Sequence, residues 1–136
     1  MKNYQASNIK FQISTKNQAP RSKPPYDLEQ RTLEFAKGVI RLCQKVDSSP
    51  ITREIVSQLV RASGSVGANY REANETITKR DFSHRIRIAL KEAKEAHYWL
   101  ALLAEAAPSI NGDVSEAQQE ALELKKILSA IAIKSR

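Results

Sequence analysis

The stretch FSHRIRIALKEAKEAHYWLALL, residues 82–103, contains the clearest periodic pattern in the sequence. Its apolar residues recur three or four positions apart: Phe82, Ile86, Ala89, Ala93, Ala96, Leu100 and Leu103. This spacing places them on one face of a long amphipathic helix. Thr78 or Asp81 can cap its start. We therefore expect a helix that continues to about Ala107.

Three further segments show the same spacing. The first follows Asp27, which we expect to cap it, and its apolar face holds Leu28, Thr32, Phe35, Val39, Leu42 and Val46. The second runs from about Pro50 to about Thr76 behind a cap at Ser48 or Ser49, and another runs from about Val114 to Lys134. Four helices with short turns predict an all-α fold, an up-and-down antiparallel four-helix bundle over residues 26–136.

The charge of the chain is concentrated at its N-terminus. The formal net charge is +7, and residues 1–25 account for +5 of it because they contain no acidic residue. This polar segment ends in prolines, which predicts a disordered basic arm. Its patch IKFQI, residues 9–13, could form a strand against a partner. A basic arm favours polyanionic ligands, although it can equally serve solubility alone.

The segment RASGSVGANYREA, residues 61–73, places small and polar residues inside the second helix. A glycine inside a helix costs about 1 kcal/mol relative to alanine, so Gly64 and Gly67 predict a closely packed neighbour. The alanine-rich helix over 82–103 is the expected neighbour. Close packing would bury a polar ladder, and we expect a network between the two helices in which Arg61 meets Glu95 or Glu92. Its expected members are Arg61, Ser65, Asn69, Glu72, Glu92 and Glu95.

These residues resemble a known family. Arg61-Ala62, Ser65, Asn69 and Glu72, followed by Asp81-Phe82 and Glu95, are similar to four-helix-bundle proteins encoded by intervening sequences of bacterial 23S rRNA genes. The similarity spans residues 28–130, and the accessory protein of diversity-generating retroelements is similar in fold. The resemblance implies a homopentamer, no catalytic activity and a link to RNA. The chain departs from many members at Tyr70-Arg71, where they have Ile-Ala, at Ala73, where they have Gly, and at Lys91-Glu92, where they have Gly-Ser.

A second pattern on residues 79–107 is a basic stripe, which consists of Arg80, His84, Arg87, Lys91 and Lys94. These residues lie opposite the apolar face, so they form either a solvated surface or a polyanion site. With the resemblance, our leading hypothesis is an oligomer that binds RNA or other nucleic acid through phosphate contacts. The expected contact residues are Lys79, Arg80, Arg87, Lys91, Lys94, Arg21 and Lys23. The alternative is a protein–protein adaptor that binds no nucleic acid.

Other chemistry has little support in the sequence. Cys43 is the only cysteine, so an intramolecular disulfide is excluded, and we expect it to pack in the core. With two histidines and no spacing typical of metal ligands, we predict no metal, no cofactor and no catalytic residue. We expect Tyr98 and Trp99 in the core or a subunit interface. No apolar run is typical of a secretory signal or a membrane span, so the cytoplasm is the expected location.

Overall fold

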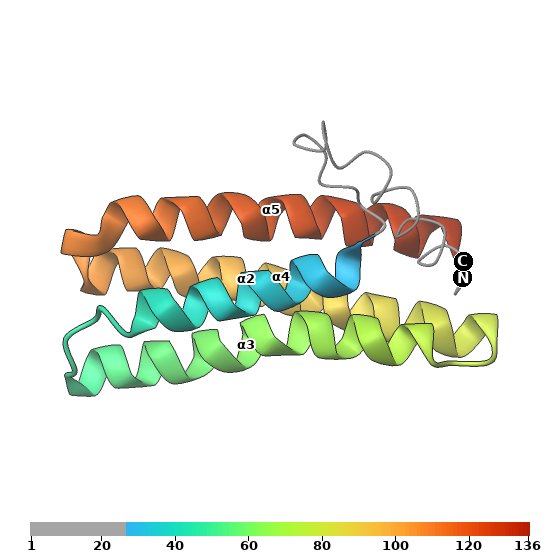
Figure 1. Cartoon of the computed structure of the whole chain (residues 1–136), viewed down its shortest axis with the longest axis horizontal. Helices are drawn as coiled ribbons and strands as arrows, with labels where there is room; N and C mark the ends of the chain where they lie inside the picture. Colours follow the sequence, from blue (N-terminus) through green and yellow to red (C-terminus); the bar gives the residue numbers. More distant parts are fainter. Residues whose placement is uncertain (1–26) are drawn as a thin grey trace.

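A computed structural model describes residues 27–136, which form four long α-helices that alternate in direction (Figure 1). They are α2 (Leu28–Cys43), α3 (Pro50–Asn74), α4 (Lys79–Ala106) and α5 (Asn111–Lys134). A 3₁₀ turn, η2 (Pro108–Ile110), precedes α5. The predicted all-α four-helix bundle is confirmed. The arm predicted over residues 1–25, including the patch at 9–13, lies outside the described residues.

Local sequence signals set the helix starts. The Ser49 hydroxyl accepts a hydrogen bond from the Thr52 backbone N–H at 3.1 Å, and the Thr52 hydroxyl accepts one from the Ser49 N–H at 2.9 Å. Thr78 caps α4 through the N–H of Asp81. Asp27 occupies the N-cap position of α2, as predicted, although its side chain makes no capping hydrogen bond. At φ −99° and ψ 49°, its backbone departs from the extended conformation typical of an N-cap.

The apolar face of α4 forms the centre of the core. All seven predicted residues of that face are buried, and Ala89, Ala93 and Ala96 are fully inaccessible. α4 packs against α3 along one side and against α5 along the other, and the α3–α4 pair is the most extensive in the bundle. Asn69, an expected member of the polar ladder on α3, is half-buried, whereas its neighbour Tyr70 is buried.

The close approach predicted at the glycines occurs at one of them, and against a different helix. A Cβ atom on Gly67 would lie 2.8 Å from Oγ1 and 3.1 Å from Cβ of Thr32, which belongs to α2 rather than to α4. Thr32 is fully buried, and its hydroxyl donates to the carbonyl of Leu28 at 2.8 Å. Gly64 is exposed, and a Cβ there would meet nothing within 4 Å. Gly67 therefore makes room for Thr32, and Gly64 makes room for nothing in the described chain.

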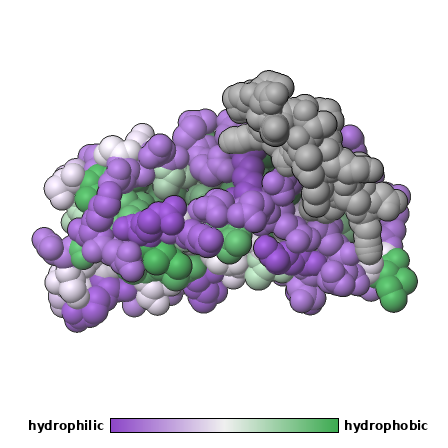
Figure 2. Space-filling model, in the orientation of Figure 1, coloured by the Kyte–Doolittle hydropathy of each residue, from purple (hydrophilic) through white to green (hydrophobic). Residues whose placement is uncertain are grey.

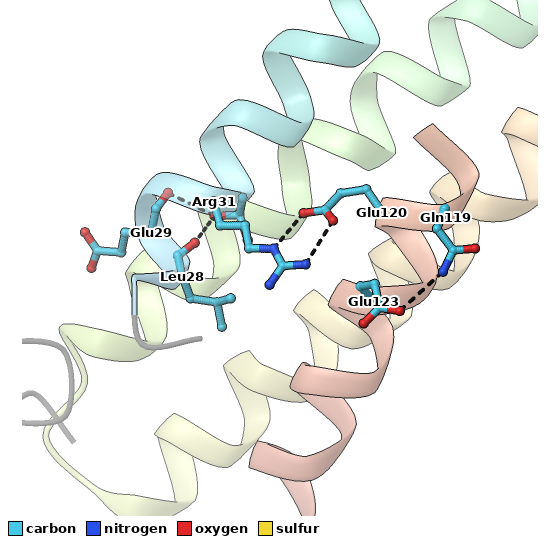
Figure 3. Close-up of polar contacts among 7 residues, drawn as sticks. Leu28, Glu29, Arg31, Gln119, Glu120 and Glu123 are labelled. Atoms are coloured by element: carbon cyan, nitrogen blue, oxygen red, sulfur yellow. Dashed lines mark hydrogen bonds and ion pairs between the residues drawn. The ribbon is translucent and has the colours of Figure 1, made fainter. Parts of the chain in front are cut away.

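Two ion pairs link α2 and the turn that follows it to α5. Arg31 Nε and Nη2 donate to the two carboxylate oxygens of Glu120 at 2.7 Å and 2.9 Å (Figure 3). Near the other end of α2, Lys45 Nζ lies 2.7 Å from Asp113 Oδ2. The hydrogen bond to Glu120 raises the pKa of Arg31, so the guanidinium is charged at every physiological pH. α2 thus has a tightly packed side against α3 and an ionic side against α5.

We expect Gly67→Ala to lower the free energy of unfolding by about 1 kcal/mol, because forcing a methyl group against Thr32 costs more than the improved helix propensity returns. Thr32 is β-branched and hydrogen-bonded, so its side chain cannot rotate away. Gly64→Ala is the matched control and should raise stability by about 1 kcal/mol. Chemical denaturation measures both changes.

Thr32→Ala supplies the second control for this contact. In a Thr32→Ala background, Gly67→Ala should be clearly less destabilising, because the hydroxyl at 2.8 Å is absent and only the Cβ contact at 3.1 Å remains. An equal loss in both backgrounds would show that Thr32 is not the group that Gly67 accommodates.

Candidate nucleic-acid interface

The basic stripe lies on the outer face of α4, opposite the apolar face that forms the core. Its five residues and the neighbouring Lys79 are all exposed, as the sequence predicted for a helix buried on its other side. At 1.5 Å per residue, the stripe spans about 21 Å from Arg80 to Lys94. Arg21 and Lys23, the other two expected contact residues, lie outside the described residues.

Contacts within α4 leave the stripe charges available. Arg87 Nη1 donates to the Ser83 hydroxyl at 2.7 Å, a neutral partner that orients the guanidinium without cancelling its charge. Lys91 Nζ lies 3.9 Å from Glu95 Oε2, a solvated pair of the kind that contributes little. Among the described residues, Arg80 and Lys94 have no hydrogen bond or ion pair. The stripe therefore presents a row of cations that an external anion can reach.

Tyr98 extends the stripe by one helical turn beyond Lys94. Its side chain is 58% exposed, and its ring meets the edge of Trp99 with centroids 5.4 Å apart and an interplanar angle of 79°. Trp99 itself is half-buried against the core. The two aromatic residues, for which the sequence predicted the same environment, therefore differ in exposure. The spacing of four residues from Lys94 was the signal that could have placed Tyr98 with the basic residues.

The predicted polar network between α3 and α4 is not formed. Arg61 is exposed, and its Nη2 donates to Gln58 Oε1 on the same helix at 3.0 Å rather than to Glu92 or Glu95. A long charged side chain at the bundle surface stays hydrated, which is less costly than burial. Glu72 is exposed and Ser65 is half-buried. The predicted contact between Arg61 and Glu92 or Glu95, on which the network depended, was therefore wrong.

A smaller α3–α4 link takes the place of that network. Asn69 Oδ1 accepts a hydrogen bond from Arg85 Nη1 at 3.1 Å, and Asn69 Nδ2 donates to the Ser65 carbonyl at 2.9 Å. Arg85 was absent from the sequence prediction. Its position on the flank of α4 beside α3 lets its guanidinium reach Asn69.

Glu92 is a buried carboxylate without a complete set of partners. The residue is only 9% exposed, and its Oε1 has no hydrogen-bond partner within the described part of the chain. Glu95, its neighbour in the predicted network, is half-buried and faces Lys91. A buried acceptor without a donor lowers stability, so we expect the burial of Glu92 on α4 to cost free energy of folding.

We expect Glu92→Met to raise the free energy of unfolding by about 1 kcal/mol, because methionine fills a similar volume without an unsatisfied oxygen. Glu95→Met, at the half-buried neighbouring position, should change stability by less than about 0.5 kcal/mol. Thermal and urea denaturation measure both. A loss of stability in Glu92→Met would mean that the carboxylate has a stabilising partner after all.

The described residues contain few other groups suited to chemistry. No group of three or more His, Cys, Asp or Glu side chains among residues 27–136 is arranged to hold a metal ion. Cys43 is half-buried, and burial raises the pKa of its thiol to about 11, which disfavours the reactive thiolate. Over the same residues, no helix has the length and apolar character that a membrane span requires.

The described chain is thus an antiparallel four-helix bundle with an apolar interior and one basic outer face. The family model described as 23S rRNA-intervening sequence protein matches residues 26–130, and the chain belongs to this family. A similar crystal structure, at 1.70 Å resolution, is that of a protein with unknown function from the S23 ribosomal protein family of Bacteroides thetaiotaomicron. The two share 31% identity with a TM-score of 0.66, and the match covers 76% of this chain and 96% of the other. No curated protein matches the chain. Neither the family description nor the description of the neighbour names a catalytic activity.

Proposed function

We propose that this protein binds RNA or another nucleic acid through contacts to phosphate groups. The observation that carries the proposal is the row of exposed cations on α4, held outward because the opposite face of the helix is fully buried. Duplex nucleic acid advances about 3.4 Å per base pair, so the stripe of about 21 Å matches about six steps of one strand. The family description names the 23S rRNA intervening sequence and no ligand; RNA is the first ligand to test because the resemblance stated above implies a link to RNA.

The chemistry of the stripe favours phosphates over base edges. Lysines and arginines on the convex outer face of a bundle contact a backbone without entering a groove, so binding carries little sequence information. Tyr98, at the end of the stripe, offers a ring for stacking on an unpaired base. The +5 charge of residues 1–25, including Arg21 and Lys23, adds further phosphate contacts in this proposal.

We also infer that the protein is a homo-oligomer. Leu33 and Ile40 lie two helical turns apart on the outer side of α2, and they are 37% and 44% exposed. Exposed apolar side chains on one face favour a contact with another chain. The resemblance stated above implies five copies, and a ring would repeat the stripe around its circumference, which strengthens binding through multivalency.

We propose the cytoplasm as the location of the protein, because an RNA ligand is available there.

Replacing Arg80, Arg87, Lys91 and Lys94 together with glutamine should weaken RNA binding and leave the fold intact. Glutamine is a good helix former, and all four side chains are exposed. Each lost phosphate contact should reduce the log–log salt slope by about 0.7 to 0.9. Fluorescence anisotropy with labelled RNAs of unrelated sequence, over a salt series, measures both quantities. The loss should be similar for every sequence.

A variant with the same charge change elsewhere separates the stripe from net charge. It replaces four exposed cations of α2, α3 and α5 with glutamine: Lys37, Arg41, Arg53 and Lys126. Binding should fall much less in this control. Equal loss in both variants would mean that overall charge, rather than the stripe, drives binding. If the wild type binds no RNA at physiological salt, the proposal fails and the adaptor alternative takes its place.

Ile40→Lys should reduce the assembled mass of the protein, because a lysine in a tight apolar contact is desolvated without a partner. Light scattering at micromolar concentration measures the mass. Ile77→Lys is the control, since Ile77 is 96% exposed in the turn between α3 and α4, at the opposite end of the bundle from Ile40. A monomeric wild-type protein would rule out the oligomer.

A further inference from the structure

A groove runs between α2 and α5 on the ionic side of α2. It encloses about 640 Å³, and its floor is formed by Phe35, Val39, Leu42 and Ala117. Figure 2 shows apolar surface in this part of the molecule, edged by hydrophilic residues. Two ion pairs cross it, Arg31 with Glu120 and Lys45 with Asp113. Gly38 deepens it further, since it has no side chain to fill the space.

The charges around the groove are not balanced. Five acidic and three basic side chains line it, which leaves two negative charges in excess. Arg31 and Lys45 are already paired, with Glu120 and Asp113, and Glu34 lies 3.5 Å from Lys37, which stands outside the lining, so one negative charge remains uncompensated. Glu116 has no ion-pair partner among the described residues. At the end where the chain enters α2, the pKa of Asp27 is raised by burial and by the nearby Glu29. An apolar floor with a negative rim fits a segment that is apolar on one side and basic on the other.

We propose that residues 9–13 of this same chain, IKFQI, dock in the groove between α2 and α5. In an extended segment, alternate side chains point to opposite sides, so Ile9, Phe11 and Ile13 share one side and Lys10 lies on the other. The apolar side matches the groove floor. Lys10, and the cations that flank the patch without any acidic residue, match the excess of carboxylates on the rim.

Connectivity allows this docking at low cost. Asp27, where the described chain begins, itself lines the groove, so the N-terminal segment is attached at the site. Residues 14–26 can reach about 43 Å when extended, and the groove is about 21 Å long from Arg31 to Lys45. An extended five-residue patch needs about 17 Å. Because a short tether gives a local concentration in the millimolar range, even weak intrinsic affinity populates the docked state.

A second hollow offers a poorer fit. It encloses about 870 Å³ where the α3–α4 turn meets the end of α5. Its floor is apolar too, but its charged lining residues are Lys79 and Lys134, with no carboxylate side chain. A basic segment is repelled there and attracted to the α2–α5 groove. The docking rests on this difference in charge and does not depend on nucleic-acid binding.

Photo-crosslinking in the full chain tests the docking. With p-benzoylphenylalanine in place of Phe11, irradiation and peptide mass spectrometry should locate adducts on peptides that contain Gly38 or Ala117. Mixing isotopically light and heavy chains distinguishes attachment within a chain from attachment between chains. We expect adducts within one chain. Adducts at Ile127 or Ile131, adducts spread over all helices, or adducts only between chains would each overturn the proposal.

Charge reversal on the groove rim provides the matched comparison. Glu34→Lys with Glu116→Lys should lower the yield of groove adducts several-fold, because it converts the rim from negative to positive. Glu75→Lys with Glu105→Lys makes the same charge change at exposed positions outside the groove and should leave the yield unchanged. Equal yields from the two variants would overturn the role of the rim charges. Circular dichroism confirms that each variant is folded.

Discussion

The burial of three alanines on α4 is the constraint on which the rest of this bundle depends. Ala89, Ala93 and Ala96 are fully inaccessible, and their small side chains let α3 and α5 approach α4 from both sides. α4 is therefore the central helix of the fold. Because this face of α4 is turned toward the interior of the bundle, the opposite face of the helix lies in solvent. The basic stripe is exposed for that reason.

The packing of α2 differs on its two sides, and this difference shapes the surface. Against α3, buried Thr32 fits into the space left by Gly67, so the two backbones come close. Against α5, Arg31 pairs with Glu120 (Figure 3), and Lys45, just beyond the end of α2, pairs with Asp113. The bundle is therefore closely packed between α2 and α3, α3 and α4, and α4 and α5, and partly open between α2 and α5. The open side is the groove proposed for the N-terminal segment.

Periodicity predicted the faces of the helices but not their individual neighbours. The apolar face of α4 was predicted residue by residue, because a regular spacing of three and four defines a face without knowledge of the fold. The neighbour of Gly67 was not predicted correctly, because a glycine allows close approach by either of the two adjacent helices. Only the arrangement in space shows that Thr32 of α2 occupies that position.

Long polar side chains were predicted least well. Arg61 and Arg85 both flank the α3–α4 contact, and each can extend in several directions. Hydration and local hydrogen bonds decide among these, so Arg61 bonds Gln58 and Arg85 bonds Asn69. In the same way, the unpaired oxygen of Glu92 depends on which donors fail to reach it. The stripe was predictable because its exposure follows from burial of the other face and needs no partner.

We propose that nucleic acid binds on the outer face of α4. Crosslinking with RNA that contains 4-thiouridine tests it most directly, because the modified base reports the residues that it touches in the unmodified protein. The account predicts adducts on α4, in the peptides that carry Lys91, Lys94 and Tyr98, at yields that fall as salt rises. Adducts confined to α2 or α5, or a yield independent of salt, would contradict it.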